Sequence, residues 1–264
     1  MLINDLTITS LETITAFTIG NGAFRFALDE LQNATIANTQ EKTDITGKGG
    51  RKLNSLKKNK AVVVSGTNGL LSNGLTEVQT GSKFEDVEAT PILWTDYLTI
   101  TGNASATTYK AVGTTGNEIE NIYILNNNVR GEKLTQDATA GEGKFAYDPD
   151  TKAITFNDGD YEDGTEIVVY YFRKVPGSVI SNRSDVYSEK VQLYIDAFAE
   201  DSCNKAYRVQ FYIPKADFSG NFDYALGGDQ TVHAFEAESL AGSCGSGGSL
   251  WTYTIIGMDA EDAA

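Results

Sequence analysis

The chain has 264 residues, enough for a sizeable hydrophobic core, and its 26 glycines with few apolar runs of helical period favour many short strands joined by turns. Its formal net charge of −15 opposes binding to phosphate backbones over most of the surface. One histidine excludes a multi-histidine metal site, and two cysteines 41 positions apart exclude a CxxC zinc or redox motif.

The N-terminal part of the chain contains three predicted extended segments. Residues 23–28 and 61–64 are short apolar runs typical of strands, and residues 34–46 are extended and polar on one side. The first residues lack the basic and apolar regions of a signal peptide, and no window approaches the roughly 20 apolar residues that span a bilayer. We therefore expect synthesis in the cytoplasm and no membrane partner.

Basic residues are concentrated between positions 42 and 60. Against one acidic residue, Asp44, this segment holds seven of them: Lys42, Lys48, Arg51, Lys52, Lys57, Lys58 and Lys60. The rest of the chain holds 14 basic and 35 acidic residues, a balance of −21. Three glycines loosen the backbone there, so residues 47–60 are predicted to form a long exposed loop. Opposite charges on one chain favour head-to-tail assembly of copies.

Nucleic-acid and nucleotide binding are disfavoured for this basic segment. Residues 40–60 contain no aromatic side chain on which a base could stack, and the remaining chain is strongly acidic. The sequence GKGGRK does not fit the GxxxxGK[ST] phosphate loop. It does not fit GxGxxG either, because Lys52 stands where the third glycine belongs.

One helix is predicted, at residues 69–80. Leu71, Leu75 and Val78 recur there at helical spacing after a segment with N-capping side chains. Gly81 is a natural C-terminal stop, whereas Gly74 lowers the helix propensity of the segment.

The remaining chain reads as strands. From residue 93 to 175, short apolar runs separated by Gly, Asn and Asp predict an inserted β module, which leaves residues 1–92 and 176–264 as the core domain. In the C-terminal third, three segments alternate strictly between apolar and polar residues, which predicts strands with one face in a core; they are residues 191–197, 207–213 and 251–256. Residues 231–241 favour a strand over a short helix.

Candidate chemical sites are few. His233 has no GxSxG elbow beside it, so we expect a structural histidine. The acidic turn at residues 158–164 has hard oxygens suited to calcium, but Asp163 replaces the glycine of an EF-hand loop, and a solvated hairpin tip is preferred. Of the two tryptophans, only Trp94 is free to stack on a sugar, because Trp251 lies in a segment whose alternation predicts a core-facing strand. No catalytic residue, metal ligand or cofactor is assigned, and an enzyme is the least supported class.

Three segments together resemble the major tail tube proteins of long-tailed bacteriophages. They are TQEKTDITGKGGRKLNSLKKNKAVVVSGTNGLLSNGL at 39–75, YRVQFYIPKADFSGNF at 207–222, and GGDQTVHAFEAESL followed by LWTYTIIG at 227–257. In the first, a strand enters the basic glycine-rich segment and a strand and helix follow it. In the second, a strand ends at Ile-Pro-Lys before a Gly-Asn-Phe turn.

This resemblance implies a mainly β fold, a two-sheet sandwich or barrel with one helix. Copies would form hexameric rings that stack, and the basic segment of each copy would reach the adjacent ring as an assembly loop. The bore would conduct DNA without binding it, because an acidic lining does not attract phosphates. The implied partners are further copies, a tape measure protein and a tail terminator protein, and the implied location is the virion tail. Residues 93–175 depart from the minimal tail tube pattern, and we expect them to be an insertion that projects from the outer tube face.

Two other functions stay open. One is another structural β protein of a virion or surface layer, which would lack the basic assembly loop. The other is a calcium-assisted glycan-binding β-sandwich, which would use the acidic turn and Trp94. A disulfide between Cys203 and Cys244 is an alternative to two reduced thiols, and reduced thiols are the preferred state.

Overall fold

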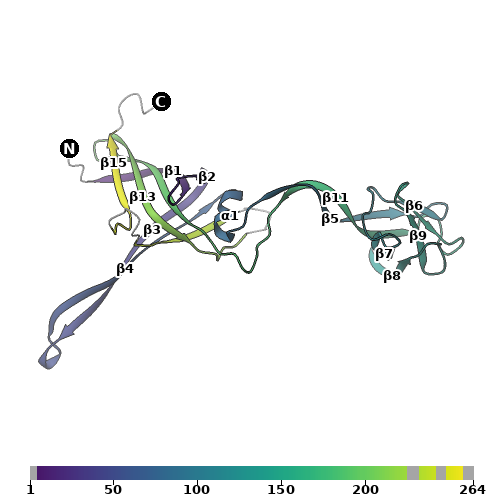
Figure 1. Cartoon of the computed structure of the whole chain (residues 1–264), viewed down its shortest axis with the longest axis horizontal. Helices are drawn as coiled ribbons and strands as arrows, with labels where there is room; N and C mark the ends of the chain where they lie inside the picture. The colour runs from purple at the N-terminus through teal and green to yellow at the C-terminus, as the bar shows by residue number, and fades with distance from the viewer. Residues whose placement is uncertain (1–4, 225–231, 242–247, 258–264) are drawn as a thin grey trace. The chain divides into compact units, whose positions relative to one another are not determined.

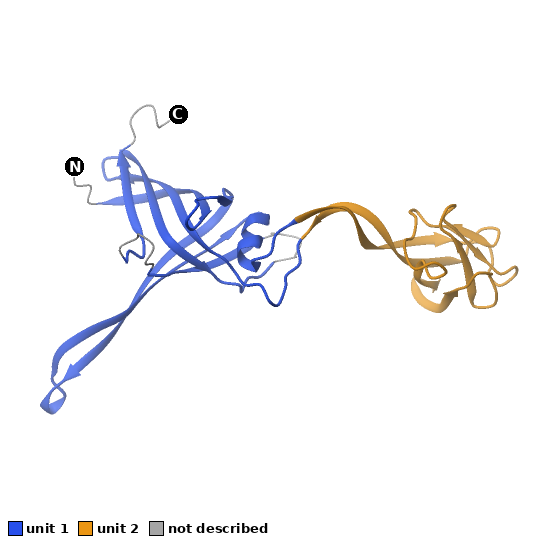
Figure 2. Ribbon diagram, in the orientation of Figure 1, with its two compact units in different colours: residues 1–84, 180–264 blue, residues 85–179 orange. Residues whose placement is uncertain are grey.

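The structure is a computed structural model that describes residues 5–224, 232–241 and 248–257. In these ranges the chain forms fifteen strands, one α-helix and one 3-10 turn. It divides into two compact units, residues 1–84 with 180–264 (unit 1) and residues 85–179 (unit 2), as Figure 2 shows. Each unit contains one sheet. The predicted mainly β fold with two sheets and one helix is confirmed. No helix in the described ranges is long and apolar enough to cross a membrane.

Unit 1 is built on an eight-stranded antiparallel sheet (Figure 1). The strand order is β2-β1-β12-β13-β14-β4-β3, and β15 pairs with β13 outside this path. The strands are β1 (Leu6–Thr18), β2 (Phe24–Leu28), β3 (Leu31–Thr46), β4 (Lys52–Asn68), β12 (Lys190–Asp201), β13 (Ala206–Phe218), β14 (His233–Ser239) and β15 (Thr252–Gly257). The strands predicted near residues 191–197, 207–213 and 231–241 are therefore confirmed.

The core of unit 1 lies on the face of this sheet that the helix α1 (Asn73–Thr80) covers. Ile14, Leu193 and Ile213, from three neighbouring strands, are fully buried there. The helix packs into the same core with Leu75 fully buried. Burying a side chain of this size contributes about 1.5–3 kcal/mol, so the alternating strands and the helix hold one another in place.

The helix α1 begins four residues later than predicted and ends where predicted. Ser72 is its N-cap, because the Ser72 hydroxyl accepts the backbone N–H of Leu75 at 3.3 Å. Gly81 closes the last turn with a φ of 71°, and its N–H donates to the Glu77 carbonyl at 2.7 Å. Residues 69–70 form a bend and Ser72 is extended, so the predicted first turn of the helix is absent.

Gly74 is required by a close approach between α1 and β2. A Cβ atom at this position would lie 2.6 Å from the carbonyl oxygen of Arg25 and 2.8 Å from the Cβ of Phe26. The helix propensity lost at Gly74 is therefore offset by the contact that lets Leu75 reach the core.

The predicted loop at residues 47–60 is wrong, because most of it is strand. Residues 52–60 belong to β4, which pairs with β3 in register from Leu31↔Asn68 to Thr46↔Lys52. Only residues 47–51 connect the two strands. Residues 40–60, which we name the arm, project from the body of unit 1 as a two-stranded ribbon (Figure 2). Both faces of the arm are in solvent, so no apolar alternation marked it as strand.

The strand β15 is less buried than its sequence pattern predicted. Trp251 and Ile255 pack partly buried against the core, but Tyr253 and Ile256 are 37% and 45% exposed. β15 pairs only with residues 207–212 of β13, so it lies at an edge where little covers it. The strand predicted at residues 251–256 is confirmed as β15, and Trp251 and Ile255 of its core-facing side are only partly covered.

Unit 2 contains a seven-stranded sheet of order β5-β11-β7-β8-β9-β10-β6, in which β8 and β9 are parallel. Its core includes the fully buried Ile122, Leu134 and Ile167. The chain enters unit 2 through β5 and leaves it through β11, and these two strands are paired. The strands are β5 (Glu85–Thr99), β6 (Ala104–Ala106), β7 (Ile119–Asn126), β8 (Val129–Gln136), β9 (Lys144–Asp148), β10 (Ala153–Phe156) and β11 (Glu166–Val179).

A buried carboxylate organises the inside of unit 2. Asp96 accepts hydrogen bonds from the Tyr171 hydroxyl at 2.7 Å, from the N–H and hydroxyl of Thr108 at 2.8 Å each, and from the Trp94 indole at 3.2 Å. Burial and the bond to Asp96 raise the pKa of Tyr171 above its ordinary value. The carboxylate therefore links β5, β11 and the segment after β6.

Candidate assembly surfaces

The hairpin register places two lysines of the arm directly opposite each other. Lys42 on β3 faces Lys57 on β4, and like charges in this position destabilise a strand pair. Within the described part of the chain, neither lysine makes an ion pair. One face of the arm therefore carries two adjacent lysines, and the nearby acid on that face, Asp44, is already paired with Lys52.

Two other basic residues of the arm have acidic neighbours. Lys52 lies 2.7 Å from Asp44, and this hydrogen bond holds the pKa of Asp44 below its ordinary value. Lys58 lies 3.9 Å from Glu41. Both pairs are well exposed, and such pairs contribute little to stability. All seven predicted basic residues are exposed on the arm: Lys42, Lys48, Arg51, Lys52, Lys57, Lys58 and Lys60.

The arm also carries an apolar surface that the sequence analysis missed. Leu56 faces Thr43 across the hairpin and lies diagonally from Ile45, so both apolar side chains share one face. Leu53 packs near Gly47 at the tip, where a Cβ on Gly47 would lie 2.8 Å from its Cδ1. Leu53, Leu56 and Ile45 are 58%, 54% and 41% exposed. Leu56 and Ile45 share a face because of the strand register, which the loop prediction did not supply.

An acidic patch lies on the solvent side of the unit 1 sheet. Along β14, alternate residues point to the core, which leaves Glu236 and Glu238 exposed on the other side. Glu238 faces Asp217 of β13, and Asp217 is 3.4 Å from Lys190 of β12. We define the acidic patch as Glu236, Glu238 and Asp217. It places two carboxylates opposite each other, the reverse of the lysine pair on the arm.

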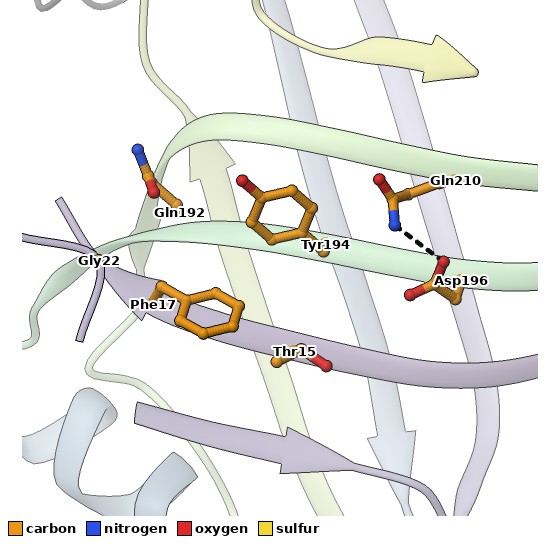
Figure 3. Close-up of a pocket in the computed structure, with 7 residues that line it drawn as sticks. All are labelled: Thr15, Phe17, Gly22, Gln192, Tyr194, Asp196 and Gln210. Atoms are coloured by element: carbon orange, nitrogen blue, oxygen red, sulfur yellow. Dashed lines mark hydrogen bonds between the residues drawn. The ribbon is translucent and has the colours of Figure 1, made fainter. Parts of the chain in front are cut away.

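A shallow hollow crosses the solvent side of β1, β12 and β13 (Figure 3). Tyr194 stacks on Tyr212 with ring centroids 4.7 Å apart, and Phe17 meets Tyr194 edge to face. Asp196 accepts a hydrogen bond from Gln210 at 3.0 Å and lies 3.3 Å from an Arg208 nitrogen. This carboxylate is already paired, so the hollow offers a polar and aromatic packing surface without a free acid or base.

His233 has the structural role that was predicted. Its ring is fully buried, and Nδ1 accepts the N–H of Ser72 at 3.2 Å. Nε2 therefore carries the proton and donates to the Gln79 side-chain oxygen at 2.7 Å. Gln79 in turn donates to the Ala234 carbonyl at 2.9 Å. Burial lowers the pKa of His233 to about 4, so the ring is neutral and ties β14 to α1.

The buried neutral His233 predicts acid sensitivity above pH 4. An unfolded histidine titrates near pH 6.5, so the unfolded state binds the proton first and stability falls as the pH drops from about 6.5 to about 4. We expect a loss of about 3 kcal/mol across this window, measured from urea midpoints. In His233→Gln, which cannot titrate, the slope over the same window should flatten. An equal slope in both proteins would contradict the assignment.

The acidic turn at residues 158–164 uses its carboxylates locally. Asp158 accepts the side-chain N–H of Asn103 at 2.7 Å, and Asp163 accepts the backbone N–H of Gly102 at 2.7 Å. No group of three or more acidic, histidine or cysteine side chains converges on a metal site in the described ranges. The turn joins β10 to β11, which are not neighbours in the sheet, so it is an exposed connection between two separated strands and the hairpin-tip interpretation is wrong.

Trp94 is not free to stack on a sugar, so that expectation is wrong. Its indole N–H donates to Asp96, and the guanidinium of Arg173 lies 4.6 Å from its ring centroid. Tyr109 also packs edge to face against the ring at 5.4 Å. Cys203 is exposed, and Cys244 lies outside the described residues, so their pairing stays a prediction.

The family of the chain is decided by a match over residues 6–249 to the model of the YomU/Tube protein family. The chain belongs to this family. The match covers nearly the whole sequence, including the arm, the acidic patch and all of unit 2. Membership of the YomU/Tube family agrees with the resemblance to phage tail tube proteins and supports a structural role in the tail of the virion. No curated protein matches the chain.

Proposed function

We propose that copies of this chain form hexameric rings that stack into a phage tail tube, and that the arm of each copy contacts the acidic surface of a copy in the next ring. The observation that carries this proposal is that Lys42 and Lys57 face each other on the exposed arm, and that neither makes an ion pair within the described residues. Outside the seven basic residues and Asp44, the chain has a balance of −21. The acidic patch is the receiving surface for the charges of the arm.

Electrostatic contact between arm and patch gives a direction to assembly. The two surfaces differ, so the contact is head-to-tail and repeats along an axis instead of closing a dimer. One exposed ion pair contributes about 0–1 kcal/mol, and stacking therefore depends on many pairs formed at once by the arms of a ring. Complementary charges also orient rings before contact.

Ring closure uses the free edges of the unit 1 sheet. β3 ends the strand order on one side and β2 ends it on the other, so among the described residues no strand covers the outer edge of either. Pairing between neighbouring copies removes these edges, which otherwise favour aggregation. The resulting wall surrounds a bore that conducts DNA, and its acidic character prevents phosphate binding. A tape measure protein and a tail terminator protein are the proposed further partners.

The inserted module is proposed to project from the outer tube face. The sequence placed it at residues 93–175, between the core segments 1–92 and 176–264. Its chain enters and leaves on β5 and β11, which are antiparallel neighbours. An insertion with this connection leaves the strand order of unit 1 uninterrupted.

Negative-stain electron microscopy of the purified chain tests the proposal. We expect rings at low concentration and tubes at high concentration, with shorter tubes as salt is raised, because the Debye length falls from about 10 Å at 0.1 M to about 3 Å at 1 M. Monomers that persist at high concentration and moderate salt would contradict a tube-forming role.

A further inference from the structure

An apolar hollow in unit 1 lies between α1 and the segments around Ile180 and Phe222. Its volume is about 570 Å³, and its walls include Leu71, Phe84, Ile180, Phe222 and Tyr224. At its rim, Leu70 and Leu71 are 60% and 51% exposed. Exposed leucines beside an apolar hollow indicate a surface that another molecule covers.

We infer that this hollow receives the apolar face of the arm from a second copy of the chain, with Leu56 and Ile45 as the anchoring side chains and Leu53 beside them. The inference rests on the proposed stacking, since it requires a neighbouring copy, and it adds a receiving surface for the apolar face of the arm, whereas the acidic patch receives the opposite face with Lys42 and Lys57. Two unlike apolar patches on one chain cover each other in a head-to-tail contact and leave none exposed along the tube.

The length of β4 separates the two patches within one chain. β4 begins at the arm tip with Lys52 and ends at Asn68, two residues before Leu70. At about 3.3 Å per residue, its 17 residues place the arm tip and the rim of the hollow about 50 Å apart. The paired β3 holds β4 extended along its whole length. The arm of a copy therefore cannot fill its own hollow without breaking this ladder.

The wall of the hollow includes polar residues, and two of them are already hydrogen-bonded to each other. Thr76 and Tyr224 satisfy each other, with their hydroxyl oxygens 2.6 Å apart. The exposed Asp223 lies between Phe222 and Tyr224 on the wall, and Lys58 lies on the same arm face as Leu56. The positive charge of Lys58 on the incoming arm thus complements the negative charge of Asp223 beside the hollow. Charges steer the arm, and the buried aliphatic side chains determine how long it stays.

Disulfide trapping tests the contact. In a Cys203→Ser, Cys244→Ser background, the chain receives both Leu56→Cys on the arm and Leu71→Cys on the rim. Each copy then has one cysteine on its arm and one at its hollow. Mild oxidation of tubes should therefore link successive copies and give a ladder of dimers, trimers and longer products on a non-reducing gel. Either cysteine alone gives dimers at most. Tubes that stack normally but give no ladder would overturn the inference and leave the proposed function standing.

A mixing experiment provides an independent readout. Leu53→Ser with Leu56→Ser disables the arm, and Leu71→Asp disables the hollow. Each variant alone should form rings with at least about a tenfold loss of stacked length, which corresponds to roughly 1.4 kcal/mol. A mixture should form ring pairs, because one intact arm then meets one intact hollow. Leu93→Ser, at a leucine in unit 2 that is 56% exposed, is the matched control and should stack normally.

The outcomes separate the two proposals. Normal stacking of the arm and hollow variants would overturn the apolar contact alone. Failure of the unaltered chain to form rings or tubes would overturn the proposed function and this contact with it.

Discussion

Replacing Lys57, Lys58 and Lys60 by glutamate is expected to abolish ring stacking while rings and fold persist. The change turns three positive charges of the arm negative and sets it against an acidic neighbour. Within one chain the change at Lys57 is favourable, because Lys42 then faces a carboxylate instead of a like charge, an effect of about 0.2–1 kcal/mol. At Lys58 the change is unfavourable by a similar amount, because Glu41 then faces a like charge instead of a lysine. Stacking should therefore be lost while the stability of the single chain stays nearly unchanged, as sedimentation and thermal melting can show.

The control for this prediction carries the same change in net charge elsewhere. Lys110, Lys133 and Lys174 are exposed residues of unit 2, and their replacement by glutamate should leave stacking intact. Loss of stacking in both variants would show an effect of net charge alone. Normal stacking in the arm variant would show that its charges do not hold rings together.

Asp96→Ala is expected to unfold unit 2 and leave unit 1 folded and able to form rings. The alanine removes the acceptor for four hydrogen bonds and leaves the fully buried Tyr171 hydroxyl without the carboxylate. Hydrogen bonds to charged groups contribute about 1.5–3 kcal/mol each, and the loss from unit 2 should reach about 3–5 kcal/mol. Unit 1 has its own core cluster, to which Asp96 does not contribute.

Limited proteolysis and thermal melting can resolve the two units in this variant. Cleavage should be confined to residues 85–179, with the melting transition of unit 1 unchanged. Asp158→Ala is the matched control, because its carboxylate is exposed and accepts one hydrogen bond from Asn103, so a change within about 0.5 kcal/mol is expected. Simultaneous unfolding of both units in Asp96→Ala would show that unit 2 is not independent.

The strands with one buried face could be predicted because burial of one face requires apolar and polar residues to alternate along the strand. Residues 191–197 alternate between core and solvent, and β12 alternates as they indicated. The stop of α1 at Gly81 was also predicted, since it depends on a local left-handed conformation. The start of α1 was missed because the earlier capping residues, Ser65 to Asn68, belong to β4, so that Ser72 is the cap instead.

The arm shows where sequence patterns fail. No core constrains residues 40–60, so their order of charged and apolar side chains has no period, and glycines near the tip suggested a loop. The strand conformation comes from the ladder that continues outward from the buried part of β3 and β4. Leu56 and Ile45 share a face only in this register.

The amino-acid sequence by itself determined the β class of the fold, the separation of a basic segment from an acidic remainder, and the similarity to tail tube proteins. These properties are local or additive, because alternation, turn residues and charge are sums over neighbouring positions. The tertiary structure decided which residues meet across long separations: Lys42 with Lys57, Asp96 with Tyr171, and the walls of the apolar hollow. Such pairs depend on strand register and on the packing of distant segments, which a linear pattern does not encode.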